Sequence, residues 1–193
     1  QLGVLHSPTL SVGVSVAHVL EPLGTVRQMA ASALVFAKGD HLDQINLRRN
    51  ALGLMVSPRS GSTERLRIRW DDAESLDMLG ALVDGFRGNL ISSKFAYQTR
   101  DIGLEYRAAV QRIEQLPEAQ ARQYQLKSAQ QLLNNQWARR CKRAAIASSG
   151  MDLLGQIYRR GLRIGCEALS RELIVSRWLS ARQINENEEA VKP

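Results

Sequence analysis

The chain has 193 residues, of which 44% are hydrophobic and 23% charged. These proportions are ordinary for a folded protein and argue against a disordered chain, and no apolar run approaches the roughly 18 residues of a membrane span. The formal charge of +7 is uneven: residues 101–183 carry 14 Lys and Arg against 7 Asp and Glu, residues 1–100 carry 11 against 9, and residues 184–193 carry 1 against 3.

The N-terminal residues alternate between strand and helix patterns. Apolar residues at every second position predict a strand over about 9–19. Helical spacing then leads to a helix end near Lys38, with Gly39 in the position of a left-handed C-terminal cap. A short helix or a loop follows Asp40, and residues 51–56 predict a second strand.

Turn-forming residues at 57–62 join this strand to a third one, in which three arginines alternate with three large apolar residues. The two sets are Arg65, Arg67 and Arg69, and Leu66, Ile68 and Trp70. Period two places the guanidinium groups together on one face, where like charges repel unless an anion lies across them. A solvated face paired with carboxylates such as Glu64 is the alternative.

Acidic residues follow this strand. Asp71, Asp72 and Glu74 predict a helix start, because carboxylates there accept hydrogen bonds from free N–H groups and complement the helix dipole. Apolar residues at helical spacing continue the helix to Phe86. An alternative is that the same carboxylates, together with Asp77, bind a divalent metal ion. The protein would then be a metal-dependent nuclease.

A last strand is predicted over 93–99, through Phe95 and Tyr97. The order strand, helix, strand, strand, helix, strand is that of a ferredoxin-like βαββαβ sheet, which can bind single strands on its open face. We therefore expect an α+β fold in three segments. These are an α+β domain over 1–100, a helical basic domain over 101–183 and an acidic disordered tail over 184–193.

The helical half contains the strongest charge signal. After a helix that stops before Pro117, residues 118–147 predict one long helix. No acidic residue lies between Glu118 and Asp152, whereas six cationic residues do. On a helical wheel Trp137 and other apolar residues form a stripe along the helix. The basic residues lie opposite this stripe or beside it. The basic residues at the end of this helix are Arg139, Arg140, Lys142 and Arg143.

Two shorter helices are predicted after Gly150, the last running to about Gln183. The first of them carries three more arginines: Arg159, Arg160 and Arg163. The segment 157–173 loosely suggests a helix-turn-helix, but its spacing fits that motif poorly.

Catalytic and cofactor motifs do not stand out in the sequence. The three histidines His6, His18 and His41 have no metal-ligand spacing, and GxSxG, GxGxxG and GxxxxGK[ST] are missing. We therefore expect no enzyme activity and no cofactor. Cys141 and Cys166 form no CxxC, and no signal sequence is recognisable, so we expect buried thiols and a cytoplasmic location.

The remaining signal is electrostatic, and 21 of the 26 cationic residues are Arg, whose planar fork suits phosphate. The sequence thus predicts a non-enzymatic DNA- or RNA-binding protein that contacts the phosphate backbone through the arginine-rich helix and strand faces named above. The alternative is a structural or assembly subunit of a homo- or hetero-oligomer without its own affinity for nucleic acid. Protein partners or self-association are expected in either case, and a membrane partner is not.

Overall fold

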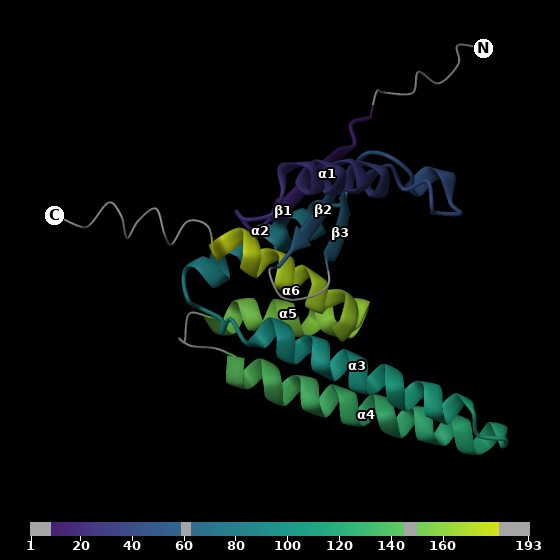
Figure 1. Ribbon diagram of the computed structural model, residues 1–193. Coiled ribbons are helices and arrows are strands. Elements are labelled where there is room, and N and C mark those ends of the chain that lie inside the picture. The colour runs from purple at the N-terminus through teal and green to yellow at the C-terminus, as the bar shows by residue number, and fades with distance from the viewer. Residues whose placement is uncertain (1–8, 59–62, 145–149, 182–193) are drawn as a thin grey trace, which may run out of the picture. The chain divides into compact units, whose positions relative to one another are not determined.

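The computed structural model describes residues 9–58, 63–144 and 150–181 (Figure 1). The chain divides into two units, residues 1–78 and 79–193, and the division falls within helix α2, Ala73–Arg87. The predicted boundary after residue 100 instead falls inside helix α3, Phe95–Glu114. The predicted acidic tail lies outside the described residues.

The first unit holds a three-stranded sheet in the order β1-β2-β3. Strand β1, Val12–Ala17, is parallel to β2, Ala51–Ser57, and β2 is antiparallel to β3, Glu64–Arg69. Helix α1, Leu23–Lys38, connects the two parallel strands and packs on both of them (Figure 1). A parallel pair needs such a crossover, since its strands cannot be joined by a tight turn.

Two glycines allow α1 to lie close to the sheet. Gly13 and Gly53 are paired in the register, and a Cβ atom on either would overlap the backbone of α1, at Leu34 and Ala33 respectively. The helix contributes the small, buried Ala33 and Ala37 to this contact. The glycine face of the sheet is therefore the face that α1 covers, and Arg67 lies directly opposite Gly53 on β3.

The connection from α1 to β2 is irregular. Gly39 ends α1 in the left-handed region with φ 69°, as predicted, and a 3-10 turn, η1, covers Ile45–Leu47. Arg49 and Asn50 then adopt positive φ angles of 55° and 50°. Such angles are uncommon for residues other than glycine, so contacts from elsewhere must hold this segment in place.

The predicted α+β class is confirmed, but the ferredoxin-like βαββαβ order is not, because the described residues contain three strands rather than four. The strand predicted over 93–99 is wrong, since α3 begins at Phe95. Helical period decides the burial there: Phe95 and Thr99 are fully buried, four residues apart, whereas Tyr97 is 36% exposed. A strand would have put Phe95 and Tyr97 on the same face.

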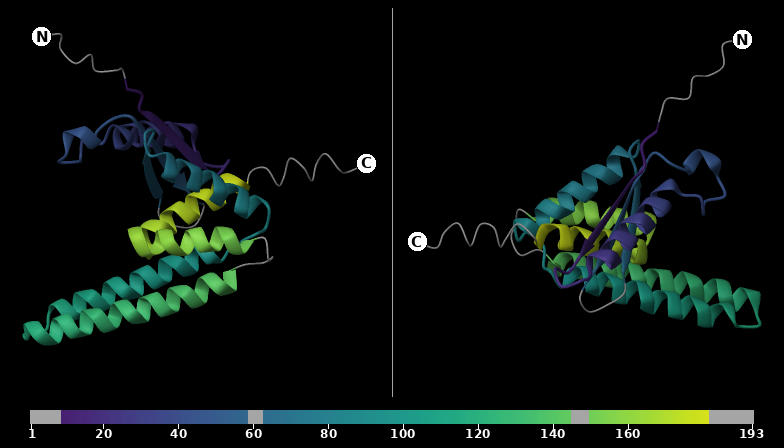
Figure 2. Two further views of the ribbon diagram at one scale, coloured as in Figure 1. Left: turned by 180° about the vertical axis from the view of Figure 1, so that it is seen from behind. Right: turned by 45° about the horizontal axis from the view of Figure 1, so that its top comes forward.

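The second unit is helical. Helices α3 and α4, Ala119–Ala144, form an antiparallel hairpin, and α5, Met151–Ile164, is followed by α6, Cys166–Ala181. The turn end of the α3–α4 hairpin extends past α5 and α6 (Figure 2). Gly165, with φ 84°, separates the two shorter helices.

Trp137 of α4 organises the core of this unit. Its ring stacks on Phe95 at 5.5 Å between centroids, and its Nε1 donates a hydrogen bond to the carbonyl of Tyr158 at 3.2 Å. Gly161 of α5 lies against the indole so closely that a Cβ atom would overlap the ring. The apolar stripe predicted on the long helix thus faces the core, and its opposite side is left for the basic residues.

Candidate nucleic-acid interface

The basic residues of the long helix are exposed as predicted. Arg139, Arg140, Lys142 and Arg143 occupy the last turns of α4, and all four are exposed. Among the described residues, none of these four side chains forms an ion pair or a hydrogen bond. They therefore form a solvated positive surface, which we call the α4 basic face.

Two carboxylates lie close to this surface. Arg139, Arg140 and Arg143 line a shallow groove of about 180 Å³, and α3 contributes Asp101 and Glu105 to its other wall. Neither carboxylate forms an ion pair with α4 within the described residues. They reduce the positive potential in the groove without neutralising it, because three arginines line the groove against two carboxylates.

The arginines of α5 separate into different environments. Arg159 and Arg163 are exposed, whereas Arg160 is 7% exposed. Arg160 donates two hydrogen bonds to Glu172 of α6, at 2.5 Å and 2.6 Å. Its inclusion among the phosphate contacts is thus corrected: a guanidinium buried in a bidentate pair has no access to a polyanion.

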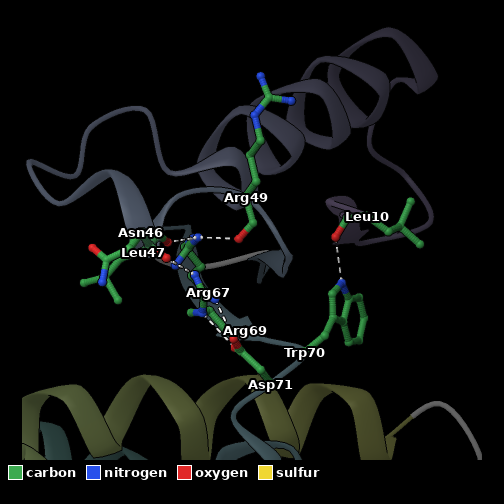
Figure 3. Close-up of polar contacts among 8 residues, drawn as sticks. All are labelled: Leu10, Asn46, Leu47, Arg49, Arg67, Arg69, Trp70 and Asp71. Atoms are coloured by element: carbon green, nitrogen blue, oxygen red, sulfur yellow. Dashed lines mark hydrogen bonds and ion pairs between the residues drawn. The ribbon is translucent and has the colours of Figure 1, made fainter. Parts of the chain in front are cut away.

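The arginines of β3 differ most from the prediction of an open basic face. Arg67 donates hydrogen bonds to three backbone carbonyls. One is that of Ala37 at 3.1 Å, and the others, shown in Figure 3, are those of Leu47 at 2.7 Å and Arg49 at 3.1 Å. These oxygens belong to the last turn of α1 and to the irregular segment after it. Burial is the main cause that lowers the pKa of Arg67, and the neighbouring Arg69 charge is the second.

Arg69 is also engaged. It donates two hydrogen bonds to Asp71, at 2.7 Å and 2.5 Å, and a third to the carbonyl of Asn46 at 2.8 Å (Figure 3). The hydrogen bonds from Arg69 hold the pKa of the Asp71 carboxyl below its usual value, and those to Asp71 raise the pKa of Arg69. Among the strand arginines, only Arg65 is exposed without a partner in the described residues.

The prediction that the strand arginines form a second phosphate-binding surface is therefore corrected. The reason is where these arginines lie in the fold. The three strand arginines share the sheet face of Gly53, which α1 approaches. A helix C-terminus presents carbonyls without intrahelical partners, and these attract cations. Arg67 and Arg69 act as clamps that hold the 45–50 segment, and they do not form an open basic row.

The candidate metal carboxylates have other partners. Asp71 is paired with Arg69, and Asp72 accepts a hydrogen bond from the Ser75 N–H at 3.1 Å, which is the predicted cap of α2. Across the described part of the chain, no three His, Cys, Asp or Glu side chains gather in a metal-binding arrangement. Nor is any helix formed by those residues both long and apolar enough to cross a membrane.

The histidines and cysteines have structural surroundings. His18 accepts a hydrogen bond from the Leu20 N–H at 3.2 Å, His41 stacks on Phe36, and His6 lies outside the described residues. Cys141 and Cys166 are buried as free thiols. Burial raises the pKa of Cys141 to about 12 and that of Cys166 to about 11, so neither is a ready nucleophile.

One cluster was missed by sequence reasoning. Two guanidinium groups lie over the ring of Tyr97 of α3, that of Arg177 at 5.2 Å and that of Arg100 at 5.9 Å from the ring centroid. Arg177 also donates a hydrogen bond to the tyrosine hydroxyl at 2.9 Å. Tyr97 and Arg177 are 80 residues apart, so no local pattern signals their contact.

Comparison of the chain with protein-family models, with curated proteins and with solved structures finds no match.

Proposed function

We propose that this protein is a non-enzymatic nucleic-acid-binding protein that holds the phosphate backbone with the α4 basic face. One observation carries the proposal: four cationic side chains lie exposed within the last six residues of α4, and none has a partner among the described residues. Uncompensated arginines on a rigid helix suit phosphate recognition, since the guanidinium fork stays charged and donates two hydrogen bonds at once.

Neighbouring residues support the same surface. Arg159 is exposed on α5, next to Tyr158, whose carbonyl bonds to Trp137 of α4. This contact brings the start of the α4 basic face near α5. The carboxylates Asp101 and Glu105 line one wall of the groove, so we expect the backbone of the nucleic acid to follow the α4 side of it.

Salt-dependent binding tests the proposal. Arg139, Lys142 and Arg143 are changed together to Gln, and binding to duplex DNA, single-stranded DNA and RNA is titrated at two salt concentrations. Each neutralised phosphate contributes about 0.9 to the log–log salt slope for duplex and about 0.7 for single strands. We therefore expect the triple variant to lose affinity, and its salt slope to fall by about 2.7 for duplex DNA and by about 2 for single strands.

A second triple variant controls for net charge. Arg112, Arg122 and Lys127 lie toward the turn of the α3–α4 hairpin. Replacing them by Gln removes an equal number of positive charges, three, from a different part of the hairpin. Lys127 is twelve residues before Arg139, about 18 Å along the helix. Equal losses in both triple variants would mean that overall charge, and not the α4 basic face, carries binding.

The alternative, an assembly subunit, is favoured by a different region. Tyr124 and Leu132 of α4 are 74% and 64% exposed, and a cleft of about 450 Å³ is lined by Val110, Leu133 and Leu162 among others. Large exposed apolar side chains and a cleft lined by apolar residues are both typical of protein contacts. A defined oligomer that shows no affinity for any nucleic acid at low salt would favour this function over the first.

The location of the protein is a further part of the proposal. Two free, buried cysteines are typical of proteins from a reducing compartment, which supports the cytoplasm.

A further inference from the structure

The cluster of Tyr97, Arg100 and Arg177 combines features that suit a nucleotide base. The ring of Tyr97 is 36% exposed, and two guanidinium groups lie 5.2 Å and 5.9 Å from its centroid. Proteins that bind single strands stack bases on aromatic rings and on guanidinium planes, and arginines nearby attract the phosphates.

A purely structural role accounts for only part of this arrangement. The hydrogen bond from Arg177 to the Tyr97 hydroxyl joins α3 to α6. These helices also meet at Gly103, which lies against the backbone of Glu167, and through the ion pair of Arg107 with Glu167. A staple between the two helices requires the hydroxyl of Tyr97, but it does not require that part of the ring be exposed.

The cluster is adjacent to the α4 basic face. Tyr97 directly precedes Gln98 and is one helical turn before Asp101, and both of these residues line the groove that contains Arg139 and Arg143. A strand held at the groove through its phosphates would therefore pass within one turn of α3 from the ring. Asp101 repels phosphate between the two places, which favours a base over the backbone at Tyr97.

We propose that Tyr97, flanked by Arg177 and Arg100, is a stacking platform for an unpaired base, so that the ligand is single-stranded nucleic acid. The inference rests on the proposed function and narrows its substrate class. Bases in a duplex are stacked on their neighbours and are not available to an external ring without being extruded. A strand with unpaired bases can use both the platform and the α4 basic face.

The test compares Tyr97→Leu with Tyr97→Phe. We expect Tyr97→Leu to weaken binding of a single-stranded oligonucleotide about tenfold, the order found for removal of one stacking aromatic, and to leave duplex binding unchanged. Tyr97→Phe keeps the ring and loses only the hydroxyl, so its affinity is expected to stay within about threefold of the original. If Tyr97 served only as a structural staple, the two variants would lose affinity equally, because Leu and Phe both lack the hydroxyl that bonds to Arg177.

Tyr124→Leu is the matched control, since Tyr124 is an exposed tyrosine of the same unit outside the cluster. We expect it to change binding less than twofold. The platform is overturned, and the proposed function kept, if the protein binds single strands but Tyr97→Leu loses no affinity or only as much as Tyr124→Leu. If the protein binds no nucleic acid at all, both the proposed function and the platform are overturned.

A measurement on the unchanged protein guards against misfolding of the variants. An oligonucleotide containing 5-iodouridine is bound and irradiated, and the crosslinked peptides are mapped. A crosslink to the peptide that contains Tyr97 supports the platform. Crosslinks confined to peptides of α4 would overturn it while supporting the α4 basic face.

Discussion

The arginines of β3 and the cations of α4 were predicted by the same argument, and the structure treats them differently. In β3, Arg67 and Arg69 direct their donors to backbone carbonyls and to Asp71. In α4, Arg139 and Arg143 extend into solvent beside a groove. A periodic row of arginines thus shows which side chains share a face, and the elements packed on that face decide whether a ligand can reach them.

The same contrast holds for two adjacent residues of α5. Arg159 is exposed, while Arg160 is buried against Glu172. Successive residues of a helix point about 100° apart, so one turns to solvent and the other to α6. The different contributions of Arg159 and Arg160 to stability can be measured by substitution, and so can those of the β3 arginines.

The largest effect is expected at the buried ion pair. Glu172→Gln removes the carboxylate that compensates Arg160, and a buried charge without its partner costs about 3–5 kcal/mol of the free energy of unfolding. Urea denaturation followed by circular dichroism measures this loss. Arg159→Gln should change the stability by less than about 0.5 kcal/mol, since this side chain is solvated.

A double variant sharpens that comparison. Arg160→Met combined with Glu172→Leu removes both charges and keeps apolar volume, so we expect it to recover most of the stability that Glu172→Gln loses. If the double variant were as unstable as the single one, shape and not charge would hold α5 to α6.

A smaller effect is expected in β3. Arg67→Ala leaves the carbonyls of Ala37, Leu47 and Arg49 without their donor, which should cost about 2–3 kcal/mol. Arg65→Ala, two residues earlier on the same face, should cost less than about 0.5 kcal/mol. Urea denaturation of the two variants side by side tests this, and equal losses would contradict the role of Arg67 as a clamp.

The smallest effect concerns pH. Because Arg69 lowers the pKa of Asp71 in the folded state, the pair stabilises the protein above the unfolded pKa of the carboxyl, and this contribution is lost as pH falls through the lower folded pKa. Carboxyl chemical shifts should show Asp71 titrating below an ordinary aspartate. Arg69→Gln should raise that midpoint, and an unchanged midpoint would show that another group sets it.

Much of the local structure was predictable. The end of α1 near Lys38, the second and third strands, the capped start of α2 and the long α4 all follow from periodicity and end signals, and the structure confirms them. The segment 93–99 was misread because it is short and contains Phe95 and Tyr97 two residues apart. Its helical state depends on burial of Phe95 against Trp137, a contact 42 positions distant in the chain.

The candidate sites divide in the same way. Exposure of the α4 basic face could be predicted, because the apolar stripe through Trp137 leaves the opposite side to solvent. Neither the carbonyls around Arg67 nor the contact of Tyr97 with Arg177 could be predicted. Both join residues 18 to 80 positions apart, and no spacing in the sequence reports such contacts.

The sequence by itself determined most of the helices and strands, residues 93–99 excepted, and which side chains of an element share a face. Both follow from the period of the backbone and from its end signals. Tertiary structure alone decided which basic faces are covered. Packing of α1 on the glycine face of the sheet brings carbonyl oxygens to Arg67, and packing of α6 on α5 brings Glu172 to Arg160. A cation is available to a ligand only where no other part of the fold satisfies its donors first.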